Sequence, residues 1–300
     1  MLLSDHRGQV FETRYNEFAV AIRPLKPGIW FRDELERADK IYAREKEVIT
    51  RYLDVRGKRV MDFGCGAGAS SVAYGWLGAE VIGVEPDANL AAAGQVRVRE
   101  DGLSGLVQIL HVPDTTQLPF PDAYFDVCIC NAVLEHIPPA QRSAHVREIW
   151  RTLRPGGYLY VTETPNRLFP YDAHTTRLWW VPWMPLPLAR RYAIWRRRVE
   201  PLESEHDLVL RGIRGVTVWE ITSGLDNSCY RFVKPSGVDE IEAHFDFRRR
   251  QSRLRLLAKG GYVALMHVLE TTICRWLHIP IVALLPDLTF CIQKLPVEGA

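Results

Sequence analysis

The feature that most constrains the fold of this chain is a regular alternation, between residues 59 and 165, of short apolar segments with longer amphipathic ones. The apolar segments are too short for buried helices, and unbroken apolar segments of this length are typical of parallel strands covered on both faces. They are RVMDFG (59–64), AEVIGVEP (79–86), FDVCICN (125–131) and YLYVTETP (158–165). The amphipathic segments between them are SSVAYGWLG (70–78), LAAAGQVRVRE (90–100) and AQRSAHVREIWRTL (140–153), the last followed by the stop signal RPGG. Strands that alternate with helices predict an α/β fold with a doubly wound, mostly parallel sheet and right-handed crossovers.

The segments on either side of this core have weaker patterns. Apolar residues at helical spacing over 33–53 predict a helix packed on the sheet, and the proline- and tryptophan-rich segment 166–215 fits no core strand. Beyond it we predict a helix (216–225), a strand (229–234), a long helical region (about 239–277) and a closing strand (288–295). The predicted organisation is therefore a cofactor-binding core with its N-terminal helix (1–165), a substrate-side insertion or lid (166–215), and the rest of the sheet with inserted helices (216–300).

Composition narrows the class of protein. A chain of 300 residues with 47% hydrophobic residues can bury a full core, and its formal net charge of +2 argues against a nucleic-acid binder. Arginine clusters at 190–198 and 248–255 leave a local surface partner open. The six cysteines lack CxxC spacing, so we predict buried free thiols in a reducing compartment and no metal site. The N-terminus has no apolar stretch long enough for a signal peptide, and a cytoplasmic location is expected.

A glycine-rich turn follows the first predicted core strand. In VMDFGCGAG (60–68), Gly64, Gly66 and Gly68 let the backbone bend sharply and lie against a ligand. A nicotinamide dinucleotide would call for a further glycine where the chain has Ala69. The second strand ends in Glu85, whose carboxylate can accept hydrogen bonds from both hydroxyls of a ribose, in an NAD enzyme as well as in others.

The motif that separates these alternatives begins at Asp114, after a short third strand. The chain resembles the class I S-adenosylmethionine-dependent methyltransferases, especially the group typified by ubiquinone-biosynthesis C-methyltransferases. The resemblance covers about residues 45–165 and rests on DFGCGAG, VEPD, D-x-x-x-LPFPD-x-x-FD, LEHI and LRPGG in this order. It implies a Rossmann-like methyltransferase fold with a seven-stranded sheet, and S-adenosyl-L-methionine as cofactor.

The resemblance also implies a role for each residue of the cofactor site. Asp62 would lie near the amino group of the methionine part, Gly64, Cys65, Gly66 and Gly68 against its backbone, and Glu85 on the ribose. Pro86 and Asp87 would flank the adenine, Asp114 would accept from its exocyclic amine, and Asn131 would close the pocket near the methionine end. Thr115, next to Asp114, is also assigned to the cofactor site. The structural alternatives are that Asp62 only orients the turn and that Asp114 only caps one.

Methyl transfer is a direct displacement, and it needs a general base only where the nucleophile must lose a proton. Three residues could supply one, in loops expected at the carboxyl ends of the strands, where ligands bind in such sheets: Glu135, His136 and His174. For His136 the alternative is a packing role, because LEHI recurs in relatives with very different substrates. For His174 the alternative is an ordinary histidine in a surface loop.

The substrate side combines tryptophans with arginines. Trp179, Trp180, Trp183 and Trp195 lie near the arginine cluster 190–198, a composition typical of a segment at a bilayer interface, although a lid with a tryptophan core explains it as well. The apolar segment 260–286 contains His267, Glu270, Arg275 and His278, which argue against a membrane-spanning helix. A buried cap, a homodimer face and a membrane-contacting element stay open.

These features favour a small or amphipathic acceptor such as a lipid, a lipid-linked glycan or a secondary metabolite of polyketide type, with contact at the inner face of the membrane as an open possibility. The main alternative is a non-catalytic methyltransferase-like binding subunit, although each cofactor motif is intact. A nicotinamide oxidoreductase is disfavoured by Ala69 and by the absence of a Tyr-x-x-x-Lys pair after the fourth strand. A nucleic-acid methyltransferase is disfavoured because NAVL from Asn131 is not of the N/D-P-P-Y/F type that holds a flipped base.

Overall fold

A computed structural model describes residues 1–4, 8–225, 230–239, 253–277 and 279–296. The chain divides into two compact units. Unit 1 consists of residues 1–131 and 151–157, and unit 2 of residues 132–150 and 158–300.

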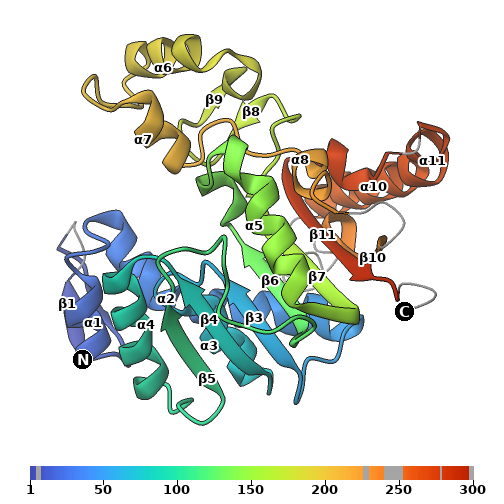
Figure 1. The fold of residues 1–300 in the computed structure, drawn as a ribbon. Coiled ribbons are helices and arrows are strands. Elements are labelled where there is room, and N and C mark those ends of the chain that lie inside the picture. The colour runs from blue at the N-terminus through green and yellow to red at the C-terminus, as the bar shows by residue number, and fades with distance from the viewer. Residues whose placement is uncertain (5–7, 226–229, 240–252, 278, 297–300) are drawn as a thin grey trace. The chain divides into compact units, whose positions relative to one another are not determined.

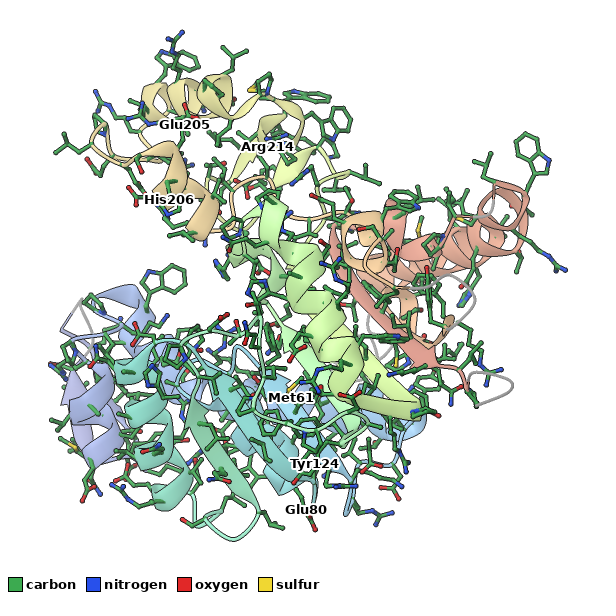
Figure 2. The ribbon with its side chains drawn as sticks, in the orientation of Figure 1. Met61, Glu80, Tyr124, Glu205, His206 and Arg214 are labelled. Carbon is green, nitrogen blue, oxygen red and sulfur yellow. The ribbon has the colours of Figure 1, made fainter. Side chains whose placement is uncertain are left out.

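Unit 1 is built on four parallel strands in the order β6-β3-β4-β5 (Figure 1). Their bounds are Arg59–Phe63 for β3, Glu80–Glu85 for β4, Val107–His111 for β5 and Phe125–Asn131 for β6. Met61, in the middle of β3, is fully buried (Figure 2), as an apolar strand covered on both faces should be. The predicted doubly wound α/β sheet is confirmed, and three of the four apolar segments chosen from the sequence are these strands.

Helices cover this sheet, and the alternation of strand and helix follows the sequence closely. The elements of unit 1 outside the sheet are β1 (Leu2–Ser4), β2 (Val10–Glu12), α1 (Glu17–Ile22), α2 (Ile29–Val48), the 3-10 turn η1 (Ile49–Arg51), α3 (Ala69–Trp76) and α4 (Ala88–Glu100). Helix α2 packs on α3, and α1 packs on α4. The helix predicted over 33–53 therefore begins earlier, at Ile29, and ends in a 3-10 turn.

The sheet continues into unit 2 with antiparallel strands. The order of all seven strands is β10-β11-β7-β6-β3-β4-β5, in which β7 (Leu153–Pro165) pairs antiparallel with β11 (Asp287–Lys294), and β11 with β10 (Tyr230–Ser236). One sequence prediction is corrected here: the strand expected from residue 158 already begins at Leu153, so RPGG belongs to the strand. Arg154 is held there by an ion pair with Asp126, with 2.8 Å between Nε and Oδ1.

The segment 166–215 has a small hydrophobic core of its own. Its elements are β8 (Tyr171–Asp172), β9 (Leu178–Trp179), the 3-10 turn η3 (Val181–Trp183), α6 (Leu186–Trp195) and α7 (Glu205–Leu210). Strands β8 and β9 form a separate antiparallel pair, and residues from Leu178 to Ile213 pack into one buried cluster. The two ends of the segment meet in a parallel bridge between Asn166 and Val216. The predicted domain boundaries stay predictions.

The remainder of unit 2 is helical except for β10 and β11. Its helices are α5 (Pro139–Thr152), α8 (Val218–Thr222), α10 (Arg253–Leu269) and α11 (Arg275–Leu277); the last two residues of α5 belong to unit 1. Its turns are the 3-10 turns η2 (Leu134–His136) and η5 (Ile281–Leu284) and the π-helical turn η4 (Glu270–Cys274). Of the predicted strand 229–234, Cys229 lies outside the described residues, as do residues 240–252 of the predicted helical region.

Among the helices that the structure describes, none has the length and apolar character to cross a membrane. The five described cysteines are buried thiols that form no disulfide with one another, as predicted.

Candidate functional site

The glycine turn after β3 takes a conformation that only glycine adopts readily. Gly64, Gly66 and Gly68 all have positive φ angles, of 71°, 55° and 77°. The backbone amides of Gly64 and Cys65 donate to Val84 O on the neighbouring strand, at 2.8 and 3.1 Å. A side chain at Gly66 would meet no heavy atom within 4 Å, so this stretch of backbone borders open space. The Cys65 thiol, by contrast, is buried against Gly83 of β4, which leaves only its backbone for a ligand.

Asp62, on β3 just before this turn, is a buried carboxylate with an unsatisfied oxygen. Ser71 Oγ donates to its Oδ2 at 2.6 Å, whereas Oδ1 is buried and has no hydrogen-bond partner. Burial raises the pKa of Asp62 to about 6, against the opposing effect of neighbouring serine hydroxyls. A buried acceptor of this kind costs free energy unless a ligand satisfies it. The ammonium group of an amino acid is a donor of the right charge.

Glu85, the last residue of β4, shapes the turn as well as being available to a ligand. Its Oε2 accepts from Gly66 N at 2.8 Å and its Oε1 from Asp87 N at 3.0 Å. Burial raises its pKa, and the two backbone hydrogen bonds oppose this rise. Each carboxylate oxygen has a second lone pair, so the hydroxyls of a ribose can still donate to it.

The predicted adenine contacts occupy two separate turns of unit 1, one after β4 and one after β5. Asp87 is the N-cap of α4 and accepts from Asn89 N and Leu90 N, and Asp114 accepts from the backbone and hydroxyl of Thr116 at 2.9 and 2.5 Å. Both carboxylates thus have local capping roles, which was the structural alternative for Asp114. Pro86 is exposed, and its carbonyl lies 3.1 Å from His111 Nε2. Thr115 and Asn131, the last residue of β6, are buried.

A buried arginine on α4 supports the glycine turn through a hydrogen bond to its backbone. Arg97 on α4 is completely buried; its Nη1 donates to Ala67 O in the turn at 2.9 Å and to Glu34 Oε1 on α2 at 3.0 Å. Its guanidinium carbon lies 4.0 Å from the ring centroid of Phe18, in cation–π contact. Gly94 lets α4 approach the turn, because a Cβ there would come within 3.3 Å of Ala67 C. Sequence reasoning missed this support, although Arg97 lies on the apolar face of α4.

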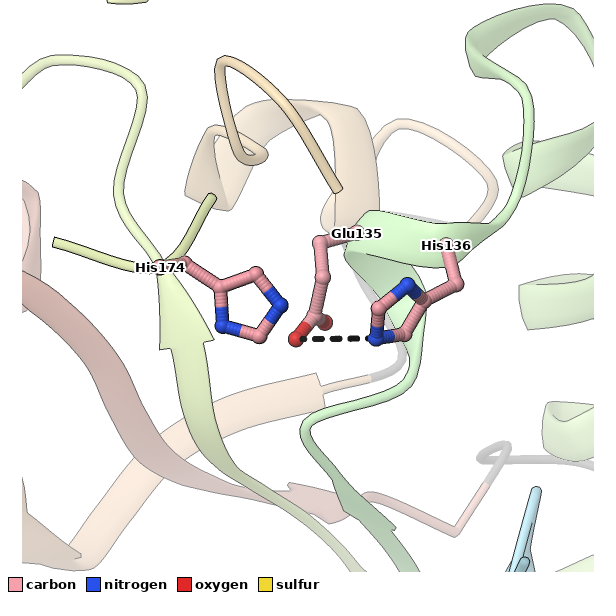
Figure 3. A group of neighbouring side chains, drawn as sticks. All are labelled: Glu135, His136 and His174. Carbon is pink, nitrogen blue, oxygen red and sulfur yellow. Dashed lines mark ion pairs between the residues drawn. The ribbon is translucent and has the colours of Figure 1, made fainter. Parts of the chain in front are cut away.

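The three residues proposed as general bases come together in unit 2. Figure 3 shows the Glu135 carboxylate between the imidazole rings of His136 and His174. Glu135 Oε1 lies 3.8 Å from His136 Nε2, and the two ring centroids are 5.4 Å apart. Glu135 is fully buried, His136 partly exposed and His174 exposed, so the group reaches from the interior to the surface. The sequence suggested each residue separately but not their contact.

Two further residues, which the sequence did not suggest, position this group. Asp172 is buried and accepts from the backbone amides of His174, Thr175 and Thr176, which fixes the loop that carries His174. Gly212 packs directly against the group: a Cβ there would lie 2.8 Å from Glu135 Cγ and 3.2 Å from His174 Cδ2, and its φ is +81°. Glycine is therefore needed at 212 both for space and for backbone conformation.

Unit 1 also has a cavity of about 620 Å³ along the edge strand β5, lined by residues such as Arg59, Glu80, Gln95 and Tyr124. Figure 2 labels Glu80 and Tyr124 on this part of the unit. None of the predicted cofactor residues lines it. Because the unsatisfied carboxylate and the positive-φ turn are elsewhere, we place the candidate cofactor site at the turn.

Comparisons with known proteins find similarity to methyltransferases. Residues 61–161 match the family model described as a methyltransferase domain. Over 146 residues the chain is 29% identical to the ubiquinone biosynthesis O-methyltransferase of Psychrobacter cryohalolentis, which covers 49% of this chain and 54% of that protein. Over 125 residues it is 37% identical to an uncharacterized methyltransferase of Mycobacterium sp. (strain KMS), covering 41% and 44%.

The chain thus spans about half the length of the curated relatives it matches. Among solved structures, the S-adenosylmethionine dependent methyltransferase from Mesorhizobium loti is similar with a TM-score of 0.47 and 16% identity, covering 84% of this chain and 98% of that one. The matched residues 61–161 contain the turn, Asp62 and Glu85. Residues 61–161 of the chain are therefore similar to methyltransferase domains.

Proposed function

We propose that this chain transfers a methyl group from S-adenosyl-L-methionine to an amphipathic acceptor. The observation that carries the proposal is the buried Asp62, whose Oδ1 lacks a hydrogen-bond partner beside a turn of three positive-φ glycines. These residues fit the cofactor: Asp62 would accept from its ammonium group, the turn would lie along its methionine part, and Glu85 would accept from its ribose hydroxyls. Pro86, Asp87, Asp114, Thr115 and Asn131 complete the proposed pocket.

When bound, the cofactor supplies a methyl group on a positively charged sulfur. The contribution of unit 1 would be to fix that group, since alignment of the reactants is worth on the order of 7 to 11 kcal/mol in such displacements. Three hydrogen-bonding groups on separate elements, Asp62, Glu85 and the turn itself, define the orientation.

When the acceptor is an alcohol, its hydroxyl must lose a proton. Glu135, His136 or His174 would accept that proton as a general base. His136 Nδ1 lies 2.7 Å from Leu210 O, and a carbonyl can only accept, so Nδ1 carries the hydrogen in the neutral ring. The lone pair is then on Nε2, the nitrogen that lies near Glu135. In the sequence this group follows β6 directly, as expected of residues near the carboxyl ends of the strands.

The amphipathic character of the acceptor is inferred from the surface of segment 166–215. Trp179, Trp180, Trp183 and Trp195 are each more than half exposed, and neighbouring rings among the first three lie 5.3 to 6.5 Å apart. Exposed arginines accompany them at positions 191, 196, 197 and 198. Exposed tryptophans beside cationic side chains suit an interface with anionic lipid. We propose contact with a membrane surface and a lipid or lipid-linked glycan as acceptor.

Transfer of a tritiated methyl group into fractionated lipid extracts tests the activity. The intact chain should label an extractable lipid or glycolipid, and Asp62→Asn should reduce labelling to background because the cofactor loses its charged partner. Cofactor binding without labelling of any lipid, glycan or small polar acceptor would favour the non-catalytic binding subunit.

Sedimentation with vesicles tests the membrane contact. We expect binding to vesicles that contain phosphatidylglycerol, weakened by salt and by the double substitution Trp180→Ala and Trp183→Ala. Trp219→Ala is the matched control, because Trp219 is exposed on α8, outside the tryptophan segment. The contact would be refuted if the double variant, Trp219→Ala and the unsubstituted chain all sediment with the vesicles to the same extent.

A further inference from the structure

We propose that Glu135, His136 and His174 bind a divalent transition-metal cation. This inference goes beyond the proposed methyl transfer, which needs no metal, and concerns residues that the sequence suggested only as general bases. The group consists of two imidazoles and one carboxylate, the donor set of many iron, zinc and manganese sites. Among the residues that the structure describes, it is the one group of histidine, cysteine and acidic side chains with ligand atoms close enough to share an ion.

The distances are compatible with a shared cation. One ligand atom from each of the three side chains lies within 4.8 Å of the other two, and Glu135 Oε1 and His136 Nε2 are 3.8 Å apart. Bonds of about 2.0 to 2.2 Å to a common ion place neighbouring ligand atoms about 3 to 3.5 Å apart. The three side chains would therefore need to close by roughly an ångström, which rotamer adjustments of exposed His174 can supply.

The hydrogen bond of His136 prepares it as a ligand. Metal-bound histidines usually donate their other ring N–H to a carbonyl or carboxylate, which fixes the tautomer and the ring plane. His136 makes such a bond through Nδ1 to Leu210 O, so Nε2 is the coordinating nitrogen. The loop of His174 is fixed in a comparable way, because Asp172 accepts its backbone amide and those of the next two residues.

The burial of Glu135 favours a cation over a simple ion pair. A fully buried carboxylate is costly unless a positive charge lies close to it. The imidazole of His136, 3.8 Å away, is charged only when it is protonated. A divalent ion held by Glu135, His136 and His174 would place a permanent positive charge beside this carboxylate.

Three protein ligands leave coordination positions for other oxygens. An acceptor with two adjacent hydroxyls, as in a sugar or a catechol, would fit such positions, and a bound cation would favour loss of one hydroxyl proton. The exposed side of His174 gives such an acceptor access to the ion. The site would then set the acceptor class of the proposed reaction, but metal binding itself does not depend on that reaction.

Calorimetric titration of the full chain with metal ions tests the proposal directly. The protein, free of any polyhistidine tag and dialysed against a chelator, is titrated with Zn²⁺, Co²⁺ and Mg²⁺ without cofactor or acceptor. We expect one equivalent of Zn²⁺ or Co²⁺ to bind, and Mg²⁺ to bind much more weakly because imidazole suits it poorly. Glu135→Gln and His174→Ala should each weaken Zn²⁺ binding about tenfold or more.

His267→Ala is the matched control, because the partly exposed His267 at the end of α10 lies 3.6 Å from Glu270 and could bind metal adventitiously. Affinity that survives His174→Ala, or that disappears with His267→Ala, would overturn the proposal, as would the absence of binding by the unsubstituted chain. Cofactor titration of each variant reports whether unit 1 is folded. Metal binding without cofactor binding would refute the proposed function and leave this inference standing.

His174→Cys gives a second result that does not depend on loss of binding. A thiolate at this position should produce a new cobalt charge-transfer band in the near ultraviolet when Co²⁺ is added. The five described native cysteines are buried and contribute little background. If Co²⁺ produces the same spectrum in His174→Cys as in the unsubstituted chain, His174 is not a ligand and the proposal fails.

Discussion

The glycine turn of unit 1 and the Glu135, His136 and His174 group of unit 2 are built in different ways. The turn is one continuous stretch that follows a buried strand, and it is held by Glu85 on the next strand and by Arg97 from beneath. The second group draws on two short segments, η2 and the loop after β8, with Gly212 packed against both. The difference between them is that the turn is contained in one local motif, whereas the second group depends on contacts between segments far apart in the sequence.

The largest effect is expected from removing the arginine beneath the turn. Arg97→Met would leave the Glu34 carboxylate and the Ala67 carbonyl without their buried donor. Losing one partner of a buried ion pair costs about 3 to 5 kcal/mol, so the free energy of unfolding should fall by that amount. Urea denaturation measures it.

Arg99→Met is the control on the same helix, because the ion pair of Arg99 with Glu17 is exposed. Exposed pairs contribute about 0 to 1 kcal/mol. Similar destabilisation by both substitutions would show that Arg97 is not a special support of the turn.

A smaller effect is expected when the pH is lowered. Burial raises the pKa of Asp62 to about 6, so the carboxylate is ionised at pH 7.5 and largely protonated at pH 5. Only the ionised form accepts a charge-assisted hydrogen bond from an ammonium group, which in turn keeps Asp62 ionised in the complex. Cofactor affinity should therefore fall as the pH drops through 6, by about tenfold at pH 5, equivalent to roughly 1.4 kcal/mol. Titrations across this range measure it.

Asp62→Asn cannot titrate at this position, so the weak binding that remains in this variant should not change between pH 7.5 and pH 5. If the cofactor affinity of the unsubstituted chain does not change with pH, Asp62 does not bind the ammonium group of the cofactor.

The smallest effect is expected at Gly212. An alanine there would press on Glu135 Cγ at 2.8 Å and would have to adopt a φ of +81°. The Zn²⁺ affinity should fall by about three- to tenfold, a loss of order 1 kcal/mol, with cofactor affinity unchanged. Gly260→Ala is the control, since a Cβ there meets nothing within 4 Å. If Gly212→Ala lowered the cofactor affinity as much as the Zn²⁺ affinity, the two sites would not be independent.

The contrast between the two regions also explains how much the sequence could predict. The strands of unit 1 and the turn residues could be predicted because apolar segments, glycines and terminal carboxylates are local signals. Glu135, His136 and His174 could each be proposed, but their contact depends on the path of the chain between η2 and β8. Gly212 and Asp172 act through backbone geometry and left no pattern in the sequence.

Arg97 is an intermediate case, since its position among Ala93, Gly94 and Val98 on one face of α4 was a usable signal of burial. The start of β7 at Leu153 could not be predicted, because RPGG is a usual helix stop signal, whereas in the structure these residues extend the strand and Arg154 pairs with Asp126 on β6. The role of Arg97 and the start of β7 are both features of the tertiary structure.

The central claim is that Asp62 and Glu85 hold S-adenosyl-L-methionine, and calorimetric titration with the cofactor tests it most directly. We predict micromolar binding at pH 7.5, weakened about a hundredfold by Asp62→Asn and at least tenfold by Glu85→Gln, because charge-assisted hydrogen bonds contribute about 1.5 to 3 kcal/mol each. His174→Ala should bind the cofactor as the unsubstituted chain does. No binding by the unsubstituted chain, or binding unchanged by both carboxylate substitutions, would contradict the account.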